Sequence, residues 1–578
     1  MGKPVVRKTR DISIVLCGEA GHGIQTVEQI LTRLLKLSGF HIFATKEYMS
    51  RVRGGSNSTE IRVSSRRVSA LLDRIDILIP LSPAALGHLK GRISNETVIL
   101  ADGATIADRE ENNDLNWIDI PFADIASEIG GKIYTNSISV GIIAGLFKVG
   151  ADELDHYIEQ FFSTGDTKII EKNRSAAKKG YEIARELMHA KKIHIDVARN
   201  ADVTGEIIIN GAEAVGIGAI AGGCNFISSY PMSPSTAVLT FLSRNAKDFN
   251  LIAEQTEDEI SAVNMALGAW YAGGRAMVTT SGGGFALMEE AVGLAGMIES
   301  PVVIHVAQRP GPATGLPTRT EQGDLQLVLY SGHGEFPRII LAPGTLEDAV
   351  DVTHRAFNLA DKYQVPVFIL TDQYFMDSYY NIPALDLSET GVTQYIEETD
   401  HDYERYRITP NGISPRGIPG YGKGLVLVDS DEHDEKGHIT EDLDLRVAMV
   451  NKRLAKLADI TDESIPPELV GREDYTVLII GWGSTFHVIR EAIECLGRTD
   501  VAFLHFKQVY PVHPYAAEYL AKAKRTIVVE GNATGQFGRL IRTVTGYDID
   551  NRILKYNGIQ FTVEELTEQI KTILDQGE

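Results

Sequence analysis

The sequence predicts an α/β protein with three doubly wound, Rossmann-like domains, and three observations lead to this prediction. Short runs rich in β-branched residues recur along the chain and are followed by glycine-containing turns or helical patterns. Residues 251–308 read as a β-α-β-turn-α-β unit, which requires parallel strands. The length of 578 residues suits about three or four domains of usual size.

The composition is that of an ordinary globular protein, with 43% hydrophobic and 23% charged residues. Lysine and arginine total 56 against 78 acidic residues, and the resulting net charge of −22 argues against nucleic-acid binding. No apolar run reaches membrane length, and the first residues lack the apolar core of a signal peptide. We therefore expect a cytoplasmic protein that binds neither nucleic acid nor membrane.

Cysteine usage restricts the chemistry of the chain. Cys17, Cys224 and Cys495 lie far apart, without a CxxC pair. Three cysteines cannot supply the four thiolates of a common iron–sulfur cluster, and they do not form a disulfide framework. If the protein is a redox enzyme, its electron relay must lie on another chain.

The first domain is expected over residues 1–195. A strand at residues 11–17 leads through the glycines of residues 18–23 into a helix at residues 24–35. The spacing is G-x-x-G-x-G, not the dinucleotide fingerprint G-x-G-x-x-G, so these glycines are read either as an anion-binding turn or as an aid to close strand-to-helix packing. Further strands are expected at residues 59–64, 75–80 and 97–101, a helix at 168–191 and a linker at 191–204.

The second domain is expected over residues 200–390, opening with a strand at residues 206–210. Its centre has strands ending near Ala253 and spanning residues 276–280 and 301–306, with a glycine-rich turn at residues 281–284. Helices are expected from Glu259 onward and over residues 286–297, and later strands at 338–341 and 365–370.

Glu259 opens a helix that is otherwise small and apolar. A carboxylate on the core-facing side of a helix start is costly to bury without a partner. In the alternative interpretation, Glu257, Asp258 and Glu259 only complement the positive end of the helix dipole.

Arg309 follows the strand at residues 301–306, where parallel sheets commonly bind ligands. Its planar fork suits a carboxylate, and the alternative is a structural ion pair. Residues 391–467 form a loop-rich connection. Its acidic and histidine-containing run, residues 429–438, is a candidate metal site that we do not favour. A helix at 444–457 follows, and the third domain, residues 468–578, has strands at 475–480, 501–506 and 526–530.

Glu259, the small residues after it and the segment 280–283 (TSGG) resemble the pyrimidine-binding domain of thiamine-diphosphate enzymes. In that superfamily the glutamate binds a ring nitrogen of the aminopyrimidine and so activates the cofactor. Residues 230–234 (YPMSP) and 308–318 (QRPGPATGLPT) narrow the resemblance to alpha subunits of the 2-oxoacid:ferredoxin oxidoreductases, whose turn usually reads YPITP. Ser233 keeps the hydroxyl of that threonine and loses its methyl group.

The resemblance covers nearly the whole chain. Residues 46–56 resemble the gamma-type domain of this family, which implies a gamma domain fused ahead of the alpha subunit. Residues 432–438 resemble its EHDExGH segment, which is not associated with a metal. Residues 530–536 (EGNATGQ) resemble an alpha-subunit motif within a domain like the C-terminal domain of transketolase.

The resemblance implies site residues and cofactors. Glu259 is catalytic, Arg309 with Thr314, Thr318 and Ser233 binds the substrate, and Tyr230, Pro231, Ser233 and Glu259 contact thiamine diphosphate. Arg51 and Arg53, in a basic cluster with Arg66 and Arg67, are a candidate site for the phosphates of coenzyme A, or else a solvated face or a subunit contact.

A beta subunit is implied as the partner of this chain. Residues 322–324 (QGD) match part of a GDG metal motif, but Leu325 replaces the second glycine, so the diphosphate half of the site is missing here. The beta subunit is expected to bring Mg²⁺, the diphosphate site and a [4Fe-4S] cluster. It would also serve ferredoxin, since the acidic surface of this chain does not favour docking of an acidic ferredoxin. A dimer of alpha–beta heterodimers is expected.

The implied reaction is oxidative decarboxylation of a 2-oxoacid with coenzyme A as acyl acceptor, and its reverse is reductive carboxylation. The fused layout suits 2-oxoglutarate, with branched-chain 2-oxoacids and pyruvate as alternatives. Two other classes stay open: a non-redox thiamine-dependent lyase or transketolase-like enzyme, and a noncatalytic nucleotide-sensing or scaffold protein.

Overall fold

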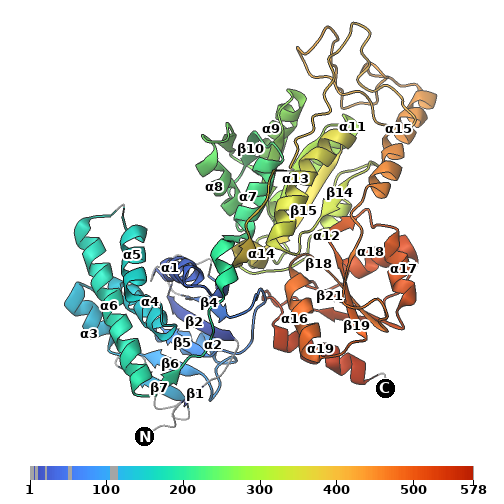
Figure 1. Ribbon diagram of the computed structural model, residues 1–578. Coiled ribbons are helices and arrows are strands. Elements are labelled where there is room, and N and C mark those ends of the chain that lie inside the picture. The colour runs from blue at the N-terminus through green and yellow to red at the C-terminus, as the bar shows by residue number, and fades with distance from the viewer. Residues whose placement is uncertain are drawn as a thin grey trace. The chain divides into compact units, whose positions relative to one another are not determined.

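A computed structural model describes residues 5–6, 11–19, 23–49, 55–103, 115–163, 165–388 and 390–576. The chain forms two compact units (Figure 1): residues up to Ile209 with Asp377–Ala384, and Asn210–Met376 with the residues from Leu385 onward. Three large sheets rich in parallel strands carry these units. The predicted α/β class is therefore confirmed. Within the described residues, no helix is both long and apolar enough to cross a bilayer.

The first unit contains an eight-stranded sheet in the order β7-β6-β5-β2-β4-β3-β16-β9. The strands from β7 to β2 run parallel, whereas β4 pairs antiparallel with both β2 and β3. The antiparallel half was not predicted, because β3 was missed; only a short segment joins β3 to β4, and a parallel pair would need a longer crossover. The strands are β2 (Asp11–Glu19), β3 (His41–Glu47), β4 (Ser56–Ser64), β5 (Ile77–Pro80), β6 (Val98–Ala101), β7 (Asn116–Asp119), β9 (Glu206–Asn210) and β16 (Tyr379–Pro383).

The strand at residues 206–210 differs from its expected place. It was expected to open the second domain, but as β9 it is the edge strand of the first unit's sheet, beside β16. Two polar contacts explain the arrangement. Asn381 Oδ1 of β16 accepts a hydrogen bond from Ile42 N at 2.7 Å, and Glu206 pairs with Arg67. The carboxylate of Glu206, at the start of β9, is therefore paired with an arginine of the first unit.

Helices cover this sheet, and α4 packs closely along α6 (Figure 1). Glycine makes this approach possible, since a Cβ at Gly141 would overlap the carbonyl of Ala177, and one at Gly180 that of Ile138. The predicted helices at 24–35 and 168–191 are confirmed as α1 and α6. The elements are α1 (Ile24–Leu37), α2 (Ala85–Leu89), α3 (Phe122–Ile129), α4 (Thr135–Leu146), α5 (Ala151–Phe161), α6 (Thr167–His189), and the short pair β1 (Val5–Val6) and β8 (Ile193–His194).

The second unit contains a seven-stranded sheet in the order β11-β10-β12-β13-β15-β14-β20. All strands are parallel except β20, an edge strand contributed by the C-terminal region. The strands are β10 (Phe226–Ser229), β11 (Ile252–Gln255), β12 (Ala276–Thr280), β13 (Val302–Gln308), β14 (Ile339–Leu341), β15 (Pro366–Asp372) and β20 (Gln508–Tyr510). The helices are α7 (Gly211–Ala221), α8 (Thr236–Asn245), α9 (Glu259–Tyr271), α10 (Gly282–Phe285), α11 (Glu289–Met297), α12 (Leu325–Leu329), α13 (Leu346–Tyr363) and α14 (Gln373–Asp377).

Residues 385–388 and 390–442 are loop-rich, where a loop-rich connection was expected over 391–467, and they lead into α15 (Leu443–Asp462). A buried ion cluster holds α15 in the second unit: Glu299 lies 2.5 Å from the ammonium groups of both Lys452 and Lys456. Asp361 of α13 similarly binds Arg275, at 2.9 Å, and Arg416 of the loop-rich segment, at 2.6 Å. Buried charges paired in this way fix the connection against the rest of the unit.

The C-terminal region forms a five-stranded sheet in the order β17-β19-β18-β21-β22, antiparallel only at β17. Its predicted strands are confirmed. The elements are β17 (Glu468–Val470), β18 (Val477–Trp482), β19 (Val501–Phe506), β21 (Arg525–Glu530), β22 (Asn551–Leu554), α16 (Phe486–Leu496), α17 (Tyr515–Lys522), α18 (Gln536–Thr545) and α19 (Val563–Asp575).

Candidate functional site

Glu259 is the first residue of α9, and its carboxyl group is buried. The preceding residue, Asp258, caps the helix by accepting a hydrogen bond from Ser261 N at 2.7 Å. Glu259 is only 3% exposed, and within the described residues its Oε1 has no hydrogen-bond partner. Burial raises the pKa of Glu259, Asp258 adds to this rise, and Arg309 opposes it. The role of complementing the helix end therefore fits Asp258, and Glu259 is a buried acid with one unsatisfied oxygen.

The glycine-rich segment after β12 was expected to be a turn and is the short helix α10. Phe285 N donates to Ser281 O at 2.8 Å, and Ala286 N donates to Gly282 O at 3.0 Å. These i to i+4 bonds close a helical turn directly after the strand, and α11 then begins at Glu289, later than predicted.

Each glycine of α10 lies against an oxygen atom from another element. A Cβ at Gly282 would overlap the carboxyl group of Asp324, and one at Gly284 would overlap Glu259 Oε1 and Thr280 Oγ1. A Cβ at Gly283 would lie 3.5 Å from its nearest neighbour, the carbonyl oxygen of Ala313. Only glycine brings the backbone so close to both acids. These glycines therefore shape the site.

Arg309 directly follows β13 and joins two loops. Its Nη1 donates to the main-chain oxygen of Ser233 at 2.7 Å. Ser233 lies in the turn between β10 and α8, together with Tyr230, which is 40% exposed, and the half-buried Pro231. The structure thus brings Arg309 to the predicted turn, although this contact uses the main chain of Ser233 and not its hydroxyl group.

Thr314 and Thr318 lie on the loop that begins at Arg309. Thr314 is exposed and Thr318 is half-buried. The loop closes on itself, because Leu316 N donates to the carbonyl oxygen of Pro310 at 3.1 Å. Both threonines share a loop with Arg309, and their substrate-binding role stays a prediction.

Asp324 is a further acid of this region and the last residue of the segment 322–324, which matches only part of a metal motif. Its Oδ2 is buried and has no hydrogen-bond partner within the described residues. Burial raises the pKa of Asp324 to about 7; Glu321 contributes to the rise and Arg309 opposes it. The positive charge of Arg309 therefore lowers the pKa of both acids, Asp324 and Glu259, against the effect of burial.

The C-terminal region holds the loop that carries Asp324. Gln322 donates to the carbonyl oxygen of Trp482 at 2.9 Å and exchanges two hydrogen bonds with Gly531. Gln536 Nε2 donates to Gly323 O at 2.7 Å. The motif at residues 530–536 thus contacts this loop directly.

The acidic and histidine-containing run uses its carboxylates in ion pairs and hydrogen bonds within the chain. Glu432 binds Arg453 through two hydrogen bonds, at 2.9 and 3.0 Å, and also pairs with Arg446. Asp434 Oδ1 accepts from the main-chain nitrogens of Lys436 and His438, each at 2.9 Å. Across the described parts of the chain, no three acidic, histidine or cysteine side chains gather as metal ligands. The run therefore stabilises the loop and the start of α15.

The predicted coenzyme A residues, Arg51 and Arg53, lie outside the described residues. Of the same basic cluster, Arg66 is exposed and Arg67 pairs with Glu206. Gly23, the last glycine of the N-terminal motif, has φ 72°, and a Cβ there would overlap the amide group of Asn136. Close packing accounts for this glycine.

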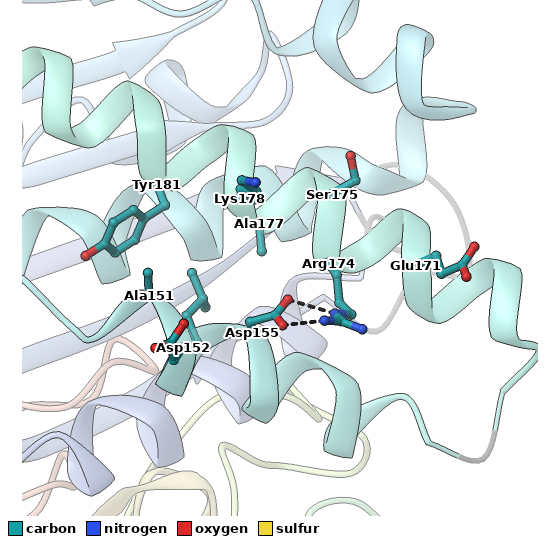
Figure 2. Close-up of a pocket in the computed structure, with 10 residues that line it drawn as sticks. Ala151, Asp152, Asp155, Glu171, Arg174, Ser175, Ala177, Lys178 and Tyr181 are labelled. Atoms are coloured by element: carbon teal, nitrogen blue, oxygen red, sulfur yellow. Dashed lines mark hydrogen bonds and ion pairs between the residues drawn. The ribbon is translucent and has the colours of Figure 1, made fainter.

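A half-open pocket of about 520 Å³ lies between α5 and α6 of the first unit. Figure 2 shows Arg174 turned toward Asp155, to which it donates from Nε at 2.7 Å. Tyr181 donates to the carbonyl oxygen of Val149 at 2.7 Å. These polar groups already have partners, and none of the predicted site residues lines the pocket.

Two protein-family models match the chain. One, described as the thiamine-diphosphate-binding region of pyruvate flavodoxin/ferredoxin oxidoreductase, matches residues 217–452. The other, described as pyruvate ferredoxin/flavodoxin oxidoreductase, matches residues 13–183. The first match contains Glu259, Arg309 and Asp324.

Known proteins match nearly the full length. The alpha subunit of a 2-oxoacid:ferredoxin oxidoreductase from Sulfolobus sp. is 32% identical over 98% of both chains. The 2-oxoglutarate oxidoreductase subunit KorA of Mycobacterium tuberculosis is 27% identical over 99% of this chain and 93% of its own. A solved 2-oxoglutarate:ferredoxin oxidoreductase from Magnetococcus marinus, with 2-oxoglutarate, coenzyme A and succinyl-CoA bound, is 30% identical and has a TM-score of 0.91, covering 98% of this chain and 100% of that one.

Proposed function

The chain belongs to the family of 2-oxoacid:ferredoxin oxidoreductase alpha subunits, and from this premise we propose that it is the gamma–alpha fused subunit of a 2-oxoglutarate enzyme. The reaction is cleavage of the C1–C2 bond of 2-oxoglutarate, with release of CO₂, formation of the thioester succinyl-CoA and transfer of two electrons, one at a time, to ferredoxin. The reverse reaction fixes CO₂. The relatives from Mycobacterium and Magnetococcus, whose names include 2-oxoglutarate, support this substrate.

The buried Oε1 of Glu259, which has no hydrogen-bond partner in the described part of the chain, carries the proposal. A thiamine aminopyrimidine needs a carboxyl oxygen at one ring nitrogen, and Glu259 offers one away from solvent. Gly284 leaves the space beside this oxygen free of a side chain. The residues of this chain therefore fit the pyrimidine half of thiamine diphosphate.

When bound, thiamine diphosphate supplies the nucleophilic carbon and takes up the electron pair of the broken C–C bond. Glu259 would hold the pyrimidine ring through its carboxyl group, and the burial of that group would keep its proton away from water. Tyr230, Pro231 and Ser233, in the turn after β10, would contact the cofactor. Arg309 pairs with a substrate carboxylate, and Thr314, Thr318 and Ser233 donate hydroxyl groups to the substrate.

A beta subunit completes the site. The three cysteines cannot hold an iron–sulfur cluster: Cys17 and Cys224 are buried and Cys495 is exposed. The described residues also offer no group of metal ligands for a diphosphate. The beta subunit therefore supplies Mg²⁺, the diphosphate site, the [4Fe-4S] cluster and the contact with ferredoxin. The active form is a cytoplasmic dimer of alpha–beta heterodimers, and Arg51 and Arg53 bind coenzyme A.

Co-expression with a candidate beta chain tests the proposal. The purified complex is assayed with 2-oxoglutarate, pyruvate and a branched-chain 2-oxoacid, with a viologen dye and with or without coenzyme A. We expect the highest kcat/KM with 2-oxoglutarate, and dye reduction only when both chains are present. A preference for another acid overturns the substrate, an iron-free complex that decarboxylates without reducing dye favours a non-redox thiamine enzyme, and activity of this chain alone overturns the shared site.

A further inference from the structure

Asp324 is a half-buried acid with one buried carboxyl oxygen, and it packs against the same short helix as the proposed cofactor-binding acid. Its carboxyl group packs against Gly282, and Glu259 packs against Gly284, two residues further along the same short helix. The Oδ2 of Asp324 is buried without a hydrogen-bond partner among the described residues. An unsatisfied buried oxygen in a native fold calls for an explanation, and a bound ligand is one.

The backbone around Asp324 is fastened on both sides of the loop. Asp324 N donates to Gln308 Oε1 at 2.9 Å, and the other end of the Gln308 amide donates to Thr371 O at 3.1 Å. Gln536 accepts from Gln326 N at 2.9 Å and donates to Gly323 O at 2.7 Å. Gln308 immediately precedes Arg309, so these bonds hold the backbone of Asp324 close to the backbone of Arg309.

Two charged groups act on the Asp324 carboxyl. Glu321, on the same loop, repels its ionised form, and Arg309, after β13, attracts it. The glycines of α10 and the Gln536 amide, which pack against this loop, carry no charge. Burial therefore outweighs the attraction of the single arginine, and Asp324 carries a proton in mildly acidic solution and is partly ionised near pH 7.

We propose that the Asp324 carboxyl group, whose Oδ2 has no hydrogen-bond partner among the described residues, and Arg309 together receive a carboxylate of the 2-oxoacid, with Asp324 as hydrogen-bond donor. This inference rests on the proposed function, because it takes a 2-oxoacid as the ligand. An ionised Asp324 would repel the substrate and compete for the arginine; the protonated acid instead adds a donor. Substrate binding is thus coupled to uptake of one proton wherever the free Asp324 is ionised.

Infrared spectroscopy of the alpha–beta complex, without substrate, tests the protonation. Since burial raises the pKa of Asp324 to about 7, the carbonyl stretch of a protonated carboxyl group is expected to disappear with a midpoint near that pH. Asp324→Asn removes this band, whereas Glu259→Gln does not. A spectrum whose titration is the same in Asp324→Asn overturns the proposal.

The pH dependence of kcat/KM for the 2-oxoacid tests the coupling. In the unsubstituted complex, kcat/KM is expected to fall roughly tenfold per pH unit above the midpoint, mostly through KM. Asp324→Asn keeps a hydrogen-bond donor but cannot ionise, so kcat/KM of this variant should no longer fall at high pH. Glu321→Gln removes the repelling charge, so it moves the midpoint to lower pH, and it serves as a second variant if Asp324→Asn fails to fold.

The outcomes separate the two proposals. If the complex turns over a 2-oxoacid and Asp324→Asn keeps the unsubstituted pH profile, or Glu321→Gln leaves the midpoint in place, the role of Asp324 is overturned and the proposed function stands. If no 2-oxoacid is turned over, the proposed function fails, and with it the ligand assigned to Asp324. A flattened profile in Asp324→Asn, combined with the shifted midpoint in Glu321→Gln, supports the coupling.

Discussion

Arg309 Nη1 lies 2.7 Å from the main-chain oxygen of Ser233, and this bond ties together the loops that follow two different strands of one parallel sheet. Ser233 lies in the turn after β10, and Arg309 directly follows β13. The carboxyl ends of parallel strands lie at one edge of a sheet, where ligands usually bind. The guanidinium group is thus held at the place where the proposed cofactor and substrate meet.

Glu259→Gln is expected to lower kcat on the order of 10²–10⁴-fold, because an amide cannot exchange a proton with the ring nitrogen. The free energy of unfolding should stay equal or rise, since the substitution removes a buried ionisable group. Turnover of the complex and a urea midpoint measure the two effects. The matched control is Glu257→Gln at an exposed position two residues earlier, and equal loss of activity in both variants would contradict the prediction.

Gly284→Ala is expected to destabilise the protein by about 1–3 kcal/mol, because its Cβ would overlap Glu259 Oε1 and Thr280 Oγ1. Gly283→Ala adds the same methyl group where the nearest atom is 3.5 Å away, so its unfolding midpoint should stay close to the original. Chemical denaturation of both variants makes the comparison. Equal unfolding midpoints in the two variants would show that α10 accommodates the added methyl group at Gly284 without loss of stability.

The Glu299 ion cluster predicts sensitivity to acid. Burial alone would raise the pKa of Glu299, but Lys456, Lys452 and Arg405 together hold it below its usual value of 4.5. A depressed carboxyl pKa contributes stability that is complete above the unfolded pKa and is lost as pH falls toward the folded one. The free energy of unfolding should therefore drop below about pH 4.5.

Glu299→Gln tests this effect. Two buried lysines lose their partner, so the variant should be destabilised by about 3–5 kcal/mol at neutral pH and should show a shallower decline below pH 4.5. Urea midpoints from neutral to acidic pH give both quantities. Glu290→Gln, at an exposed position on α11, should follow the unsubstituted protein, and an identical acid limb in Glu299→Gln would assign the loss to other groups.

Gln536→Ala is expected to raise KM for the 2-oxoacid more than it lowers kcat. The alanine removes the bonds to Gly323 and Gln326, so the loop carrying Asp324 gains freedom that substrate binding must then restrict. Hydrogen exchange over residues 320–326, together with steady-state kinetics, measures the change. Thr543→Ala, at an exposed position on the same helix, is the control. Slower hydrogen exchange or an unchanged KM in Gln536→Ala would show that the C-terminal motif does not support substrate binding.

Local patterns were sufficient to predict much of the second unit from sequence. The strands around residues 251–308 are short apolar runs between glycine turns, and Glu259 is conspicuous as an acid beginning an apolar helix, so both were found. Asp324 was not recognised, because the features that define it are nonlocal. Its neighbours Gly282 and Gln308, and the Gln536 that fastens its loop, are distant in sequence, and no local periodicity reveals a shared carboxyl environment.

The pairing of β16 with β3 in the antiparallel half of the first unit's sheet was missed for a related reason. Strand β16 comes from residues 379–383 and pairs with β3 near the start of the chain. A local sequence pattern cannot show that a strand more than 300 residues later pairs with β3. The glycine turn of α10 was misread because glycine suits turns, and here it serves close approach to two acids.

The late strand β16 also sets an order of events during translation. The edge strand β9 adjoins only β16 in its sheet, so residues 206–210 cannot take their final place until residues 379–383 have left the ribosome. A nascent chain that stops before that point carries β3 as an open edge able to pair with other polypeptides. Early termination products, or fragments cut from the N-terminal half for separate expression, would therefore be prone to aggregate even though most of their sequence can fold.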